Sequence, residues 1–440
     1  RTPNEQENQL DFLREHINQR PINKKRLIRR TLITDALAVV FGLVACFAFI
    51  VFLPFINNRL YPEEPPQVVS FPEENNEMQP EEMVALDTEI EAGAVADDPS
   101  ESMQNTVFDQ LMNAYDYSAE DYERLYGSLA RLAQEAAKSL VTITVQGEGT
   151  DFGGIPLINT AGATGLVIAD NGVETLILTP ASALARAQEI TVTFCDGAYH
   201  TARIKSQDIS CDLCVLSVDN AEISDETKEA FVIAELGNSA YSAKPGAQVI
   251  ALGSPTGVAD SVCYGNITAD NAAIDLADTA FKRITTDIYA SPQASGVLID
   301  LRGRVIGWID MRFNPQDVRN QLSAVGISEL KPLISRLSNG GERAHFGVHG
   351  VNVPPEVKAT QEIPDGAYIT GIEMDSPAMN VGIQSGDIIA QASDVAIADY
   401  TALCSLLLNH DPEDVLHLHV LRASGGTYRE MELDVTLRKP

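Results

Sequence analysis

Two cysteines have a spacing that could support redox or metal chemistry. Cys211 and Cys214 are separated by two residues, as in redox dithiols and in one half of many zinc sites. They lie in the run DISCDLCVL, which alternates as a strand does, and no second pair or nearby histidine completes a four-ligand zinc site. Five of the six cysteines lie outside the apolar run near the N-terminus, an odd number without regular framework spacing. We therefore interpret the thiols as buried side chains, and we expect no metal and no cofactor.

Histidine is the side chain best suited to accept a proton near pH 7, and the chain has only seven of them. They are His16, His200, His345, His349, His410, His417 and His419. The stretch LILTPASAL (Leu176–Leu184) predicts a buried strand that enters a turn at Pro180, and Ser182 follows that proline. Only His200 falls in the central β-rich region, on a predicted hairpin strand, and we interpret it as an ordinary strand residue.

Length and charge limit the classes of protein that these residues can serve. At 440 residues the chain is too long for one ordinary core, so we expect two or more domains. The formal net charge of -31 argues against a nucleic-acid partner, whose phosphates require lysine and arginine. We interpret the acidic excess as a contribution to solubility.

The N-terminal part has the pattern of a membrane anchor. Residues 1–31 are polar and end in the basic cluster KKRLIRR, which precedes the uncharged run ALAVVFGLVACFAFIVFLPF (Ala36–Phe55). This run is long enough to cross a bilayer, so we predict a transmembrane helix over residues 32–56. A cleaved signal peptide is the alternative, but no small-residue cleavage site follows in INNRLYPEE. The positive charges indicate a single-pass cell-membrane protein with residues 1–31 in the cytoplasm and the rest outside.

The segment after the predicted anchor is acidic and contains several prolines. No lysine or arginine occurs between Arg59 and Arg124. Because such a composition cannot bury enough apolar surface to offset ordering entropy, we predict a disordered acidic linker over residues 57–118.

The remaining chain divides into two predicted domains. Residues 119–341 open with a periodic helix (Ala119–Leu140) and continue as short β-rich runs separated by turns, which predict an all-β barrel or sandwich closed by a helix at Ile327–Leu337. Residues 342–440 form a smaller module with a helix at Tyr400–His410 and two final strands. The predicted fold is mainly β.

Several motifs resemble the HtrA (Do-like) family, membrane-anchored trypsin-like serine proteases with one C-terminal PDZ domain. SPAMNVGIQSGDII is similar to the family's SPA-x-x-AG-(L/I)-x-x-GD-x-I signature, VIALGSPTG to its VIAIGNPLG, and ITTDIYASPQASG to its IQTDAAINPGNSGG. The resemblance implies a trypsin-like double β-barrel followed by a PDZ domain and preceded by one transmembrane helix.

The PDZ resemblance also implies a peptide-binding loop at Phe346, Gly347 and Val348. Successive backbone N–H groups can hold the terminal carboxylate of a peptide, which adds as a strand beside this segment. We expect the partners to be C-termini of peptides or unfolded proteins.

The resemblance assigns triad positions, one of which holds the wrong residue. Asp212 stands at the catalytic aspartate, Ser295 at the nucleophile, and Ser182 where ILTNNHVV has histidine. A serine nucleophile needs a neighbouring base to take its proton, and the hydroxyl of Ser182 cannot be that base near neutral pH. Loss of the histidine from a measured triad costs roughly 10⁶ in kcat.

The oxyanion hole departs from the family pattern as well. The resemblance places it at the N–H groups of Gln293 and Ser295, but the family has glycine where this chain has Gln293. Glycine adopts backbone conformations that glutamine does not readily adopt, so this substitution also argues against catalysis.

Three functions remain open from the sequence. The first is an inactive protease relative, a sensor or scaffold in protein quality control, with the homotrimer that the resemblance implies. The alternative is an active serine endopeptidase that uses a non-standard base. A third, weaker hypothesis is a barrel that shelters misfolded secreted proteins from aggregation.

Overall fold

A computed structural model describes residues 66–71, 118–150, 156–185, 187–425 and 427–439. The predicted transmembrane helix (32–56), the cytoplasmic segment (1–31) and most of the predicted linker (57–118) lie outside these residues. Among the residues that are described, no helix is both long and apolar enough to cross a membrane.

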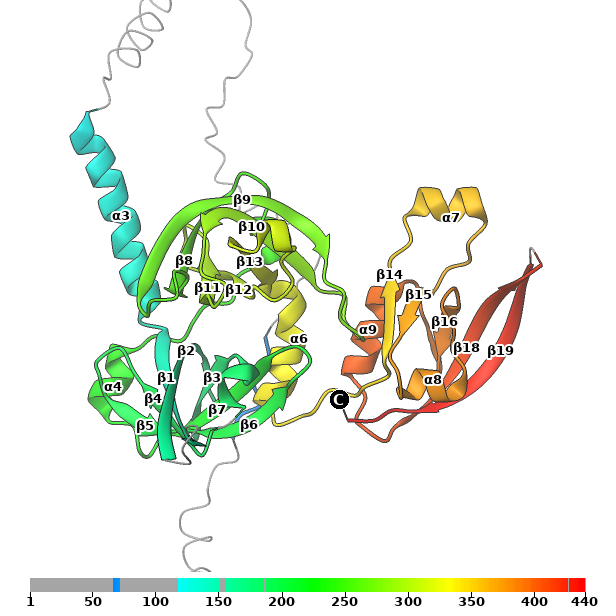
Figure 1. Cartoon of the computed structure of the whole chain (residues 1–440), viewed down its shortest axis with the longest axis horizontal. Helices are drawn as coiled ribbons and strands as arrows, with labels where there is room; N and C mark the ends of the chain where they lie inside the picture. Colours follow the sequence, from blue (N-terminus) through cyan, green and yellow to red (C-terminus); the bar gives the residue numbers. More distant parts are fainter. Residues whose placement is uncertain (1–65, 72–117, 151–155, 186, 426, 440) are drawn as a thin grey trace, which may run out of the picture. The chain divides into compact units, whose positions relative to one another are not determined.

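The first β unit is a seven-stranded antiparallel sheet in the order β5-β4-β1-β2-β3-β7-β6 (Figure 1). Its strands are β1 (Leu140–Thr150), β2 (Pro156–Asp170), β3 (Glu174–Thr179), β4 (Glu189–Thr193), β5 (Tyr199–Thr201), β6 (Arg203–Asp208) and β7 (Leu213–Asp219). Short helices η2 (Ala181–Leu184) and α4 (Asp225–Ala230) lie in its connections. The predicted buried strand in LILTPASAL is β3, which is followed at once by η2.

The second β unit is a closed barrel in the order β10-β13-β12-β11-β8-β9. Its strands are β8 (Gln248–Ser254), β9 (Ser261–Ala273), β10 (Lys282–Tyr289), β11 (Ser295–Ile299), β12 (Val305–Ile309) and β13 (Gln321–Gly326). The short helices α5 (Ser239–Ser242) and η3 (Gln316–Val318) precede β8 and β13, respectively. Closure satisfies the backbone groups that an open sheet would leave at its edges.

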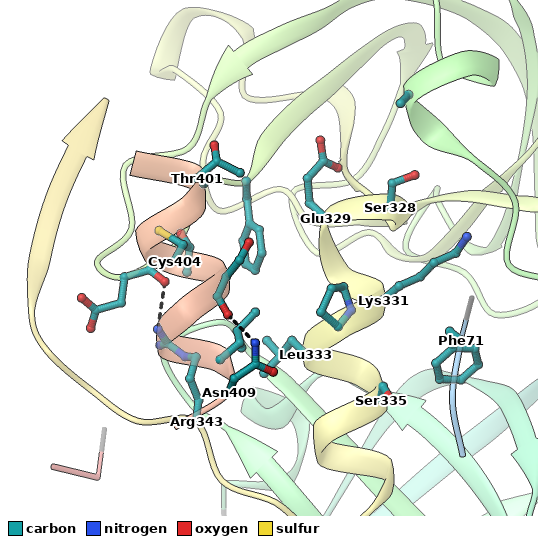
Figure 2. Close-up of a pocket in the computed structure, with 18 of the residues that line it drawn as sticks. Phe71, Ser328, Glu329, Lys331, Leu333, Ser335, Arg343, Thr401, Cys404 and Asn409 are labelled. Carbon is teal, nitrogen blue, oxygen red and sulfur yellow. Dashed lines mark hydrogen bonds between the residues drawn. The ribbon is translucent and has the colours of Figure 1, made fainter. Parts of the chain in front are cut away.

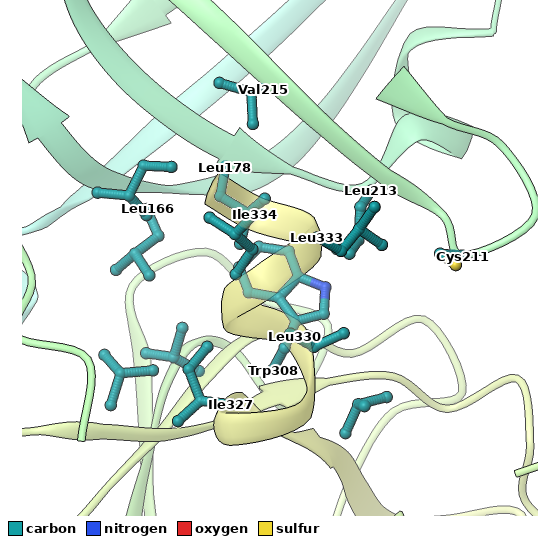
Figure 3. Close-up of a cluster of buried hydrophobic side chains, with 14 of the residues drawn as sticks. Leu166, Leu178, Cys211, Leu213, Val215, Trp308, Ile327, Leu330, Leu333 and Ile334 are labelled. Carbon is teal, nitrogen blue, oxygen red and sulfur yellow. The ribbon is translucent and has the colours of Figure 1, made fainter. Parts of the chain in front are cut away.

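One helix, α6 (Ile327–Ser338), packs against both β units. Its apolar residues Leu330, Leu333 and Ile334 are buried in one cluster with Leu213 and Trp308 (Figure 3). Strand β7 is buried on both faces, because alternate side chains point to this cluster and to the interior of the first sheet. The helix predicted at Ile327–Leu337 is thus the element that joins the two cores.

The C-terminal unit is a five-strand path, β14-β15-β16-β18-β19, with β17 paired to β16. Its strands are β14 (Val348–Val351), β15 (Ala367–Ile372), β16 (Ile388–Ala392), β17 (Val395–Ala396), β18 (Val415–Ser424) and β19 (Thr427–Thr436). Its helices are α7 (Pro355–Gln361), α8 (Pro377–Val381) and α9 (Tyr400–Leu408), the last matching the predicted helix. Strand β14 is at the edge of the path, so one of its sides is free to pair with another strand.

The predicted N-terminal helix is α3 (Ala119–Ala137). A capping box fixes its start, since the Ser118 hydroxyl accepts from the Asp121 amide and the Asp121 carboxylate accepts from the Ser118 amide. Only its C-terminal half packs on the main core, through Leu132 and Ala133, whereas the side chain of Leu125 is exposed.

A short part of the predicted linker is ordered against the folded units. Val69 and Phe71 pack against the core around α6. The carbonyl of Val69 accepts hydrogen bonds from Asn339 Nδ2 at 2.8 Å and from the Ser335 hydroxyl at 3.1 Å. The acidic composition of the predicted linker did not indicate these contacts, which depend on the apolar side chains of Val69 and Phe71.

Candidate active site and carboxylate-binding loop

Ser182 and Asp212 are in direct contact. The Ser182 backbone N–H donates to Asp212 Oδ1 at 2.5 Å, and its hydroxyl donates to Asp212 Oδ2 at 2.9 Å. Asp212 has φ 57°, a left-handed conformation that aspartate tolerates in turns. The Asp212 carboxylate therefore fixes the turn after β3. The Ser182 hydroxyl donates a hydrogen bond to this carboxylate and is not a base near neutral pH.

A guanidinium also lies near Asp212. Arg312 Nε lies 3.8 Å from Asp212 Oδ2, while Arg312 Nη2 donates to Asp310 Oδ2 at 2.7 Å and to the Cys211 carbonyl at 3.0 Å. An arginine side chain carries its proton throughout the physiological range, so Arg312 cannot act as a general base either.

Ser295 is the first residue of β11 and pairs with Ser254 on β8. In the described part of the chain, no side-chain hydrogen bond joins its hydroxyl to another residue. The following Gly296 has φ 124°, and a Cβ atom at this position would lie 2.0 Å from the carbonyl oxygen of Leu252. The position after Ser295 therefore accepts only glycine.

Two backbone N–H groups of the turn before Ser295 donate hydrogen bonds within that turn. Gln293 N–H donates to the hydroxyl of Ser291 at 3.2 Å, and Ala294 N–H donates to the Ser291 carbonyl at 3.0 Å. An oxyanion hole requires donors aimed at an open position where negative charge develops. In this structure the Gln293 amide is instead satisfied within the turn.

His200 lies on β5, at one edge of the first sheet. Strands β4, β1 and β2 separate β5 from β3, which leads to Ser182. The His200 ring packs edge-on against Phe194, with ring centroids 5.8 Å apart. This is the strand environment that the sequence predicted.

The predicted carboxylate-binding loop holds a carboxylate from the protein itself. The N–H groups of Phe346 and Gly347 donate to Asp278 Oδ2 at 2.9 and 2.8 Å. The N–H groups of Gly347 and Val348 donate to Asp278 Oδ1, both at 3.0 Å. Asp278 lies in the connection between β9 and β10, so the second barrel supplies the group that occupies this loop.

Charged neighbours stabilise Asp278 in its ionised form. Burial alone would raise its pKa, but a hydrogen bond from His345, the nearby Arg343 guanidinium and the amides of Val348 and Gly347 together hold the pKa below its ordinary value. His345 Nδ1 lies 3.0 Å from Asp278 Oδ2, and Asp278 has no exposed side-chain surface. Asp278 was not predicted as a site residue.

A cavity of about 760 Å³ lies beside Asp278, between α6 and α9. Thr401, Cys404 and Asn409 line it from the α9 side, while Lys331 and Leu333 line it from α6 (Figure 2).

The five cysteines that the structure describes are free thiols, and three of them are buried. Cys211, Cys214 and Cys404 are buried, and burial raises the pKa of each to about 12. In the described ranges, no group of three or more His, Cys, Asp or Glu residues could hold a metal ion. Cys211 and Cys214 thus have the spacing of a redox pair, but both are buried, Cys214 within β7 and Cys211 just before it.

Two domain families match the chain: residues 163–307 match the trypsin-like peptidase domain, and residues 347–435 match the PDZ domain. The chain is 29% identical over 279 residues to a probable periplasmic serine endoprotease DegP-like of Halomonas elongata, a match that covers 62% of this chain and 56% of the relative. It is 26% identical over 288 residues to the serine protease Do-like HtrA of Lactobacillus helveticus, covering 62% of this chain and 68% of the relative.

The fold is also similar to a solved structure of the HtrA-type protease AlgW with a decapeptide. The TM-score is 0.50 and the identity 21%, over 71% of this chain and 99% of the solved one. The protein is therefore a trypsin-like peptidase-domain protein with one PDZ domain. It is homologous to the HtrA and DegP proteins, and the predicted mainly β fold of trypsin-like barrels followed by a PDZ domain is confirmed.

Proposed function

We propose that this protein is a membrane-tethered, extracytoplasmic HtrA-like protein that binds C-termini of peptides or misfolded proteins but does not cleave them. The peptidase domain then serves as a platform, and the PDZ domain acts as a sensor or scaffold in protein quality control.

The observation that carries the absence of cleavage is the contact between Ser182 and Asp212. An active triad places an imidazole between the aspartate and the nucleophile, and this imidazole takes the proton of the attacking hydroxyl. Here the aspartate is satisfied by the N–H and hydroxyl of Ser182. The internal hydrogen bond of the Gln293 amide supports the same conclusion, because it withdraws a donor from the oxyanion position.

A fluorophosphonate probe and a casein digestion test this proposal directly. We expect neither labelling at Ser295 nor casein cleavage by the purified protein, and no change in the Ser295→Ala variant. Labelling or cleavage that disappears in Ser295→Ala would instead establish the active endopeptidase with a non-standard base.

Peptide capture by the PDZ domain is tested by the chemistry of the peptide terminus. We expect peptides with a free C-terminal carboxylate to bind and their amidated counterparts not to bind, because the loop amides recognise negative charge. Equal binding of both forms would contradict recognition of C-termini.

The membrane tether and the homotrimer are further parts of the proposal. The uncharged run Ala36–Phe55 supports the tether. We expect the full chain to remain in membranes after alkaline carbonate extraction, and the detergent-solubilised protein to have the mass of three chains in light scattering. Release by carbonate would exclude the tether, and a monomeric mass would exclude the trimer.

A further inference from the structure

We propose that Asp278 is an internal ligand of the PDZ domain and that a peptide terminus enters the carboxylate-binding loop only by exchanging with it. This inference rests on the proposed function, since it describes how the peptide-binding site is regulated. It concerns which group occupies the carboxylate-binding loop when no peptide is bound.

Asp278 reproduces two features of a bound C-terminal residue. Its carboxylate occupies the position enclosed by the amides of Phe346, Gly347 and Val348. Its own backbone N–H donates to the carbonyl of Val348 at 2.8 Å. This is the first hydrogen bond that a strand paired to the outer edge of β14 would make. A peptide that adds to this edge uses the same donors and the same acceptor.

The residues on either side of Asp278 extend the resemblance to a ligand. Ala277, Asp278 and Thr279 are all buried, and Ala280 packs against the apolar core of the PDZ domain. The segment therefore buries apolar surface on the PDZ domain in addition to making polar contacts.

Arg343 contacts this segment directly, and Arg336 contacts the end of α9 in the PDZ domain. Arg343 Nη1 donates to the carbonyls of Ala277 and Asp278 at 3.4 and 3.5 Å, while its guanidinium also pairs with the buried carboxylate of Asp208. Arg336 of α6 donates to the carbonyls of Leu408 and His410 at the end of α9, both at 2.7 Å. These contacts connect the PDZ domain to the elements that carry Asp278.

The contacts predict competition rather than a second independent site. A peptide carboxylate gains the same charge-assisted hydrogen bonds that Asp278 loses, so these bonds nearly cancel in the exchange. A ligand that is part of the same chain acts at an effective concentration on the order of 1 mM, and this lowers the apparent affinity of an external ligand. Removal of the Asp278 carboxylate should therefore strengthen peptide binding, by about tenfold or more if the occupied state dominates.

Two measurements on the full chain test this inference. The first is hydrogen exchange of the Phe346–Val348 amides without peptide, in the native protein and in Asp278→Ala. The second is fluorescence anisotropy of labelled peptides that differ in their last residue, each with a free and an amidated terminus. Asp317→Asn is the control, because it removes the same charge from the exposed helix η3, where the Asp317 side chain has no hydrogen bond or ion pair within the described residues. If Asp278→Ala does not fold, Asp278→Asn replaces it, since it keeps the size and removes the charge.

We expect faster exchange and tighter binding of free-carboxylate peptides in Asp278→Ala, and native behaviour in Asp317→Asn. Unchanged amide exchange would overturn the internal ligand, whatever the peptides do. Faster exchange with equal peptide affinity in both proteins would overturn the competition. Faster exchange without peptide binding in either protein would leave Asp278 as the occupant of the loop and would instead refute the proposed function.

Discussion

The guanidinium of Arg343 and the carboxylate of Asp208 form an ion pair in which the two side chains are only 3% and 0% exposed. Burial alone would raise the pKa of Asp208, but the charge and hydrogen bond of Arg343, with further hydrogen bonds from Ser210 and Cys211, hold it below its ordinary value. Arg343 lies in the connection between α6 and β14, and Asp208 ends β6. The pair therefore attaches the connection to the first sheet.

We predict that Arg343→Ala lowers the free energy of unfolding by about 3–5 kcal/mol, because it leaves a buried carboxylate without its partner. Chemical denaturation measures this change. Lys439→Ala is the control, since Lys439 pairs with Glu342 at the surface with 68% of its side chain exposed, and such pairs contribute less than about 1 kcal/mol. Similar losses in both variants would show that the buried pair has no special role.

A second prediction concerns the glycine after Ser295. Gly296→Ala should destabilise the protein by about 3 kcal/mol or more, because the added Cβ meets the Leu252 carbonyl and φ is positive. Gly172→Ala is the matched control: its φ is 87°, but no atom lies within 4 Å of the added Cβ. The control should cost only about 1–2 kcal/mol, the strain of the left-handed backbone. Equal denaturation midpoints for the two variants would rule out the clash.

A third prediction separates structural thiols from a redox pair. At pH 7.5, iodoacetamide should modify Cys195 slowly while Cys211 and Cys214 remain unmodified, because reaction requires an accessible thiolate. Partial burial and Asp196 raise the pKa of Cys195, but its thiol is exposed, whereas Cys211 and Cys214 are buried and the pKa of each is about 12. Mass spectrometry of tryptic peptides reports each site, and unfolding in guanidinium should make the buried pair reactive. Rapid modification of Cys211 or Cys214 in the folded protein would contradict this prediction and support a redox function for the pair.

A fourth prediction follows from the lowered pKa of Asp278. The folded state prefers the ionised carboxylate, so its stabilising effect is complete above the unfolded-state pKa of about 3.9 and is lost as the pH falls through the lower folded-state value. Asp278→Asn should therefore have a lower melting temperature than the native protein at pH 7, and the difference between the two melting temperatures should decrease as the pH falls below about 4. A difference that is constant from neutral to acid pH would show that the charge of Asp278 does not stabilise the fold.

The sequence predicted the elements that repeat a family pattern or a strong periodicity. The helix predicted at Ile327–Leu337 corresponds to α6, which ends only one residue later. The PDZ signature likewise predicted a loop at Phe346–Val348 from residue order alone. Burial along α3 was less predictable, since Leu125 has the same spacing as Leu132 but no partner element covers it within the described chain.

The occupant of the loop could not be predicted from the sequence. Asp278 lies far from Phe346 in the chain, within a connection that carries no motif, and its contacts arise only when the barrel and the PDZ domain fold together. The ordered stretch containing Val69 was missed for the same reason, because its partners Ser335 and Asn339 are distant in sequence. Composition reports average tendencies, whereas these contacts depend on a few side chains.

The origin of Asp278 has a consequence for how this protein is dissected. A recombinant fragment that begins at the PDZ domain would lack the β9–β10 connection, and its loop amides would face solvent. Dissociation constants obtained with such a truncation would describe an unoccupied receptor and would overstate how readily the intact protein captures a chain end.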